Sequence, residues 1–191
     1  MPDRNQSKSF SLETAAMREV SVIEEALKAL AISFRTIAEE KTVLFSYIMD
    51  IGNQRIGLNC ASQIQINSAS HHPEFLVTDV LLDVKVDAPE IESAICVFCN
   101  NVNNSSAVVG GHMVFSQEMD SRFKYKNAIL LPDGRLTPDM MRRLFNYMSI
   151  FIGGFFRTLQ NWISESGFVL EKKTDTFYVI SIMGGSVSSS T

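Results

Sequence analysis

The segment from Thr137 to about Glu165 constrains the fold most, because its pattern is typical of one long helix with unusually wide apolar coverage. Between Met140 and Ile163, 14 of 24 residues are apolar. The polar residues recur at spacings of three or four, the period of one helical face: Arg142, Asn146, Ser149, Gly153, Arg157, Gln160 and Ser164. The pattern therefore predicts a helix that packs on its own domain and has apolar surface left for a partner.

The beginning of this helix is marked locally. Thr137 can cap the first turn, Pro138 suits the first helical position, and Asp139 lies near the positive end of the helix dipole. The uncharged part, residues 144–156, is too short to span a bilayer. Its polar stripe is narrow and poor in lysine, which favours burial in protein over a position on a membrane surface.

Composition narrows the class of protein further. The 191 residues suit one domain with terminal extensions, and the formal net charge of −4 gives no basic footprint for nucleic acid or an anionic membrane. No apolar run reaches transmembrane length, and the first ten residues lack the apolar core of a signal peptide. We therefore expect a cytoplasmic protein with no membrane span and no nucleic-acid partner, whose three cysteines are reduced.

Periodicity predicts a single α+β domain over residues 11–166, preceded by a mobile N-terminus (1–10) and followed by a C-terminal extension with possible short strands (167–183) and a flexible tail (184–191). The expected sheet is antiparallel, has about five strands and is packed by helices, in the order α-β-β-β-α-β-β-α. The predicted elements are a helix over 11–30, strands over 41–51, 54–66 and 75–86, a helix from Asp87 to the asparagine-rich 100–106, strands over 108–118 and 122–131, and the long helix.

A turn and an alternating pattern support these strand predictions. The pair Gly52-Asn53 between the first two strands suits a two-residue hairpin turn with positive φ at glycine. In the third strand, valine and leucine alternate with Asp79, Asp83 and Lys85. That alternation predicts a strand with one face in the core and one face in water.

Cys96 and Cys99 form a CxxC pair, but its context does not favour metal or redox chemistry. A structural zinc site needs four ligands, and the remaining candidates are Cys60, His71, His72 and His112. A redox CxxC normally opens a helix, whereas this pair lies near the middle or end of one. The adjacent histidines seldom aim both imidazoles at one ion. We therefore predict buried thiols, no metal, no cofactor and no catalytic residues.

Two glycine pairs require a structural explanation. Gly110-Gly111 lacks the spacing of a phosphate-binding loop, so we expect a bend or a close backbone approach at the start of a strand. Gly153-Gly154 lies inside the long helix, where two glycines cost about 2 kcal/mol relative to alanine. Close approach of a second element, such as the same helix of a partner, is the first interpretation, and a kink is the alternative.

The block from Phe75 to Phe145 resembles the YbjN-like family of bacterial proteins. The resemblance rests on FLVTDVLLDVKV, a helix ending in NNVNN, then GGHMVFSQEM, RFKYKNAILL and a helix beginning TPDMMRRLF. The fold of that family is similar to that of class I type III secretion chaperones. The resemblance implies a non-enzymatic α+β domain, often dimeric, that presents sheet and groove surfaces to a protein partner. The family has been labelled a sensory transduction regulator, which specifies no ligand and no catalytic residue.

These observations favour a cytoplasmic homodimeric adaptor, regulator or chaperone-like protein that binds another protein. The predicted dimer or partner interface lies on the long helix at Phe151, Ile152, Phe155 and Trp162. One alternative is a subunit of a larger hetero-assembly, in which the same helix docks a different protein. The other alternative is a metal- or thiol-dependent enzyme that uses Cys96, Cys99, His71, His72 or His112.

Overall fold

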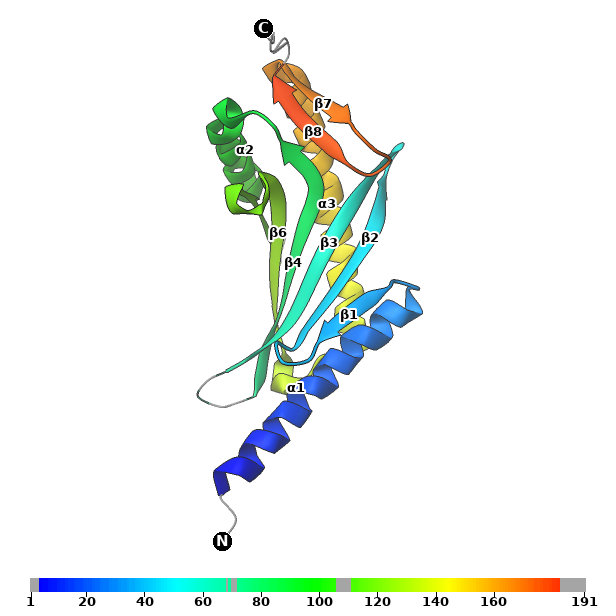
Figure 1. Ribbon diagram of the computed structural model, residues 1–191, viewed down its shortest axis with the longest axis vertical. Coiled ribbons are helices and arrows are strands. Elements are labelled where there is room, and N and C mark those ends of the chain that lie inside the picture. The colour runs from blue at the N-terminus through cyan, green and yellow to red at the C-terminus, as the bar shows by residue number, and fades with distance from the viewer. Residues whose placement is uncertain (1–3, 68, 70–71, 106–110, 183–191) are drawn as a thin grey trace, which may run out of the picture.

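A computed structural model describes residues 4–67, 69, 72–105 and 111–182, and over these residues the chain is an α+β protein with three helices and one open sheet of eight strands (Figure 1). Its elements are α1 (Arg4–Ala29), β1 (Phe34–Ile37), β2 (Thr42–Ile51), β3 (Gln54–Ile66), β4 (Pro73–Val86), α2 (Glu92–Ser105), β5 (His112–Ser116), β6 (Arg122–Leu130), α3 (Pro138–Ser166), β7 (Phe168–Lys172) and β8 (Tyr178–Ile182).

The sheet is larger than expected. Its main path is β1-β2-β3-β4-β6-β5 with antiparallel neighbours, and the β7–β8 hairpin joins it where β8 pairs in parallel with the end of β4. The prediction of an α+β fold with an antiparallel sheet is confirmed, but the count of about five strands and the order α-β-β-β-α-β-β-α are wrong. The four-residue strand β1 is too short for a period to register, and β7 and β8 lie in the predicted extension.

The two faces of the sheet differ in whether helices cover them. Helix α3 runs behind the strands, and α1 packs near β1 against the same side (Figure 1). Strand β4 shows the resulting alternation: Leu76, Thr78, Val80, Leu82 and Val84 are buried, whereas Val77, Asp79, Leu81, Asp83 and Lys85 are partly exposed. We call the side under the helices the covered face and the other side the open face.

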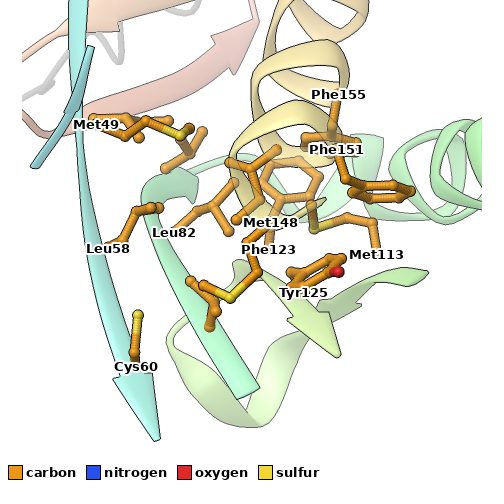
Figure 2. Packing of buried hydrophobic residues seen from close by; sticks show 14 of the residues in the cluster. Met49, Leu58, Cys60, Leu82, Met113, Phe123, Tyr125, Met148, Phe151 and Phe155 are labelled. Carbon is orange, nitrogen blue, oxygen red and sulfur yellow. The ribbon is translucent and has the colours of Figure 1, made fainter. Parts of the chain in front are cut away.

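The core lies between α3 and the covered face. Figure 2 shows Met148, Phe151 and Phe155 of α3 directed toward the side chains of the sheet. The ring of Phe151 lies 5.1 Å from that of Tyr125, and the ring of Phe155 lies 5.2 Å from that of Phe123. Aromatic rings at such separations add to the stabilisation that burial of their apolar area provides.

Helix α1 is tied to the rest of the domain by one buried carboxylate. Glu19 is 1% exposed, and its carboxylate accepts hydrogen bonds from the backbone N–H of Leu136 at 2.6 Å and from the guanidinium of Arg18. The helix begins at Arg4, so it takes in most of the segment predicted to be a mobile N-terminus. The predicted flexible tail, 184–191, lies outside the described residues.

Helix α3 begins and ends as the sequence predicts. The Thr137 hydroxyl accepts a hydrogen bond from the N–H of Met140 at 3.2 Å, and Gly167 closes the helix with a φ of 73°. The helix is continuous through Gly153 and Gly154. A Cβ at Gly154 would meet nothing within 4 Å, so the close approach expected there is not made by this chain. At Gly111 the expected close approach is confirmed, because a Cβ would overlap the Tyr125 ring.

The asparagine-rich end of α2 has a structural role at the edge of the sheet. The side-chain amide of Asn103 donates to the carbonyl of Met113 at 2.8 Å and accepts from the N–H of Met113 at 2.9 Å. Met113 belongs to β5, the last strand on the main path. The amide of Asn103 thus occupies backbone groups that a neighbouring strand would otherwise use.

Candidate functional site: the open face of the sheet

The predicted interface residues of α3 do not lie on an accessible surface. Phe151, Ile152 and Phe155 are 4%, 0% and 2% exposed in their own chain, so the interface prediction does not hold for these three side chains. Trp162 is partly exposed and packs between the rings of Phe98 and Phe168. The helix is covered by α1, α2 and the sheet together, and a partner is not needed to bury these positions.

Two large apolar side chains of α3 are exposed instead. Tyr147 is 44% and Ile150 is 65% exposed. They lie three residues apart, on the stripe of the helix that continues to Gly154. A smaller hollow of about 330 Å³ lies between the end of α1 and the beginning of α3, and its lining includes Leu30, Pro138 and Phe145.

Two of the three cysteines, Cys60 and Cys99, are buried. Burial, followed by the neighbouring Cys96, raises the pKa of Cys99 to about 12, and burial also raises the pKa of Cys60. The prediction of a buried thiol is wrong for Cys96, which is exposed on the same helix. A raised pKa keeps a thiol protonated at neutral pH and makes it a poor nucleophile or metal ligand.

The candidate metal ligands are not brought together in the described part of the chain. His72 precedes β4 and His112 lies on β5, while His71 is outside the described residues. Within the described ranges, no group of three or more histidine, cysteine, aspartate or glutamate side chains is arranged to hold a metal ion.

A broad hollow lies on the open face of the sheet. Its volume is about 700 Å³, and it extends between β1 on one side and the turn Gln117–Met119 on the other. Its apolar lining includes Phe34, Leu44, Ala61, Leu81 and Met119, and its polar lining includes Ser33, Arg35, Ser46, Asn59, Asp79 and Lys124. Strands β1, β2, β3 and β4 and the first part of β6 thus contribute to one surface.

The polar side chains in and beside the hollow bind one another across the strands. Ser46 donates to Asn59 at 2.9 Å, and the amide of Asn59 donates to Asp83 at 3.2 Å. Arg122 pairs with Asp83 at 2.8 Å. Burial raises the pKa of the Asp83 carboxyl, and the charge of Arg122 and the hydrogen bond from Asn59 act against that rise. This network holds the floor of the hollow in one arrangement.

Sequence reasoning did not identify this face as the candidate site, although one signal was available. The alternation of Asp79, Asp83 and Lys85 with apolar residues marks the wet face of one strand. A single strand shows neither which strands lie beside it nor that a hollow forms above them. The residues of β1, β2 and β6 join the site only through the topology of the sheet.

None of the described helices combines the length and the apolarity that crossing a bilayer requires.

Comparison with known proteins assigns no family. No protein-family model, no curated protein and no solved structure matches this chain.

Proposed function

We propose that this chain is a non-enzymatic protein-binding adaptor and that the open face of its sheet holds the partner. The observation that carries the proposal is the hollow of about 700 Å³ on a face that none of the described helices covers. Small molecules are usually held in sites that enclose most of their surface, whereas a broad hollow on a sheet suits a segment of another protein.

The chemistry of the face favours binding over catalysis. The carboxylates in and beside the hollow are engaged by cations, Asp79 by Lys124 and Asp83 by Arg122. The apolar side chains between them, such as Leu44 and Leu81, offer contact area without reactivity. A fixed polar network around an apolar floor is the usual composition of a recognition surface.

The resemblance to the YbjN-like family agrees with this proposal, since it implies a domain that presents sheet and groove surfaces to a protein. Membership of that family, a cytoplasmic location and a role in regulation belong to the same proposal. They rest on the resemblance of residues 75–145 to that family and on composition.

Self-association is the second candidate, and one observation favours it. Tyr147 and Ile150 are exposed on the same stripe as Gly154. A Cβ added at Gly154 would meet no atom within 4 Å. We place the contact of a homodimer on this outer stripe of α3 in place of Phe151, Ile152, Phe155 and Trp162. Light scattering at micromolar concentration tests it: a dimer that Ile150→Asp converts to monomer supports the placement, and a monomeric wild type contradicts it.

Affinity purification from the native cell tests the main proposal. The bait is the full chain in three forms: wild type, Leu44→Glu on the open face, and Val97→Glu on α2, where an equally apolar side chain is 57% exposed. We expect wild type and Val97→Glu to retain a protein that Leu44→Glu loses, with all three baits folded by circular dichroism. Retention of the same protein by Leu44→Glu contradicts the proposal.

A further inference from the structure

The open face carries an excess of positive charge in a chain whose formal net charge is −4. The strands β1 to β6 place six cationic and three anionic side chains on this side. The cations are Arg35, Arg55, Lys85, Arg122, Lys124 and Lys126, and the carboxylates are Asp50, Asp79 and Asp83. Two further carboxylates, Asp175 and Asp120, pair with Arg55 and Lys85 from the turns beside the strands, which reduces the excess to one positive charge.

Two of the six cations have no carboxylate partner among the described residues. Arg55 pairs with Asp50, Lys85 with Asp120, Arg122 with Asp83 and Lys124 with Asp79. Arg35 and Lys126 form no ion pair within the described part of the chain. Arg35 is exposed and lines the large hollow, whereas Lys126 is half-buried beside a second hollow of about 450 Å³.

The register of the sheet places these two cations on one row. Arg35 lies opposite Leu44, Leu44 opposite Ala61, Ala61 opposite Asp79, and Asp79 opposite Lys126. Neighbouring strands lie about 4.8 Å apart, so the four steps separate the two backbone positions by roughly 19 Å. An extended chain rises about 3.3 Å per residue, and about six residues therefore cover this span.

Three residues of the row, Leu44, Ala61 and Asp79, lie between the two cations. Leu44 and Ala61 form an apolar stretch beside the large hollow, and Asp79 shares both hollows and is held by Lys124 at 2.5 Å. A ligand that follows the row meets a cation, the apolar residues Leu44 and Ala61, the ion-paired Asp79 and a second cation. A nucleic acid carries closely spaced phosphates, and it would place some of them over Leu44 and Asp79.

We propose that the open face binds an extended acidic and apolar segment of a protein partner, lying across the strands. Two carboxylates of the segment, about six residues apart, pair with Arg35 and Lys126, and an apolar side chain between them enters the hollow beside Leu44 and Leu81. Arginine is suited to this contact because its planar guanidinium binds a carboxylate through two hydrogen bonds. This inference rests on the proposed function of the open face as the binding surface.

Fluorescence anisotropy with labelled twelve-residue peptides tests the inference on the full chain. The first peptide has two glutamates six residues apart with leucines between them, and the other two replace the glutamates by glutamine or by lysine. We expect the acidic peptide to bind most tightly and to weaken as sodium chloride is raised, since ion pairs at a surface are screened by salt.

Charge reversal locates the contact. Arg35→Glu and Lys126→Glu should each weaken the acidic peptide about tenfold, because each replaces an attraction by a repulsion. The matched control is Arg143→Glu, which makes the same change of charge at an exposed position of α3 and should leave binding unchanged. Circular dichroism establishes that every variant is folded.

The outcomes separate this inference from the proposal on which it rests. Equal binding of the acidic and glutamine peptides, or unchanged binding by Arg35→Glu and Lys126→Glu, overturns the acidic segment while the Leu44→Glu affinity purification still reports on the open face. Tighter binding of a twelve-nucleotide single strand, or of phosphatidylserine vesicles, overturns the assignment to a protein segment. If partner capture survives Leu44→Glu, the proposed function itself is wrong.

Discussion

The covered and open faces of the sheet are built from the same strands but are stabilised in different ways. On the covered face, Val80 and Leu82 are fully buried and pack among apolar side chains under the helices. On the open face, Asp79 and Asp83 of the same strand pair with Lys124 and Arg122. The stability of the molecule should therefore reside in one face, and the other face is left to contact a partner.

The largest expected effect breaks the covered face. Phe155→Ala removes a ring that contacts Phe98 and Phe123 and leaves a cavity, which should lower the free energy of unfolding by about 3–5 kcal/mol. Leu81→Ala on the open face should cost about 1 kcal/mol or less, since its side chain is already partly in water. Urea denaturation measures both. Equal losses would mean that the faces do not differ in their contribution.

The second effect concerns Glu19, one of several polar side chains that are buried on the covered side. Glu19→Ala leaves the N–H of Leu136 buried without an acceptor and should cost about 2–3 kcal/mol. Glu19→Gln retains an acceptor oxygen and should cost clearly less. The midpoint of urea unfolding distinguishes the two variants. Identical losses would show that the carboxylate charge, rather than the acceptor, is what matters.

A smaller effect sharpens the contrast between packed and open glycines. Gly111→Ala should cost about 1–2 kcal/mol, because the Tyr125 ring must move to admit a Cβ. Gly154→Ala meets open space on the outer side of α3 and should stabilise the helix by about 0.5–1 kcal/mol. Thermal denaturation checks the opposite signs. A destabilising Gly154→Ala would instead indicate a partner that packs against this glycine.

The smallest effect is expected on the open face itself. A double-mutant cycle over Asp79→Ala and Lys124→Ala should give a coupling energy of about 1 kcal/mol or less, as is usual for ion pairs that retain contact with water. Urea denaturation of the wild type, the two single variants and the double variant provides the measurement. A coupling of several kcal/mol would assign this face a structural role as well.

The local part of the fold could be predicted from the sequence. Helix α3 starts within one residue of the predicted position because Thr137 and Pro138 act on their immediate neighbours. The turn at Gly52 joins β2 and β3 with Ile51 opposite Gln54, as the hairpin signal indicated. Both features depend on residues that are adjacent in the chain, and short-range rules describe them well.

The remainder depends on contacts between distant segments. The apolar pattern of α3 identifies Phe155 as buried, but not that Phe98 of α2 and Phe123 of β6 cover it instead of a partner. The candidate site could not be predicted from the sequence for the same reason. Arg35 and Lys126 share a row only because β6 pairs with β4 after the chain has passed through α2 and β5.

The contact between Asn103 and Met113 has a consequence for polymerisation. A sheet can propagate into a filament when each added copy offers one free strand and covers another, which requires two receptive edges. In the described part of the chain, α2 occupies the β5 edge through Asn103, and beyond the residues paired with β1 the outer side of β2 has no neighbouring strand. Strand pairing between copies is therefore opposed at the β5 edge, and a filament that needs this edge cannot grow.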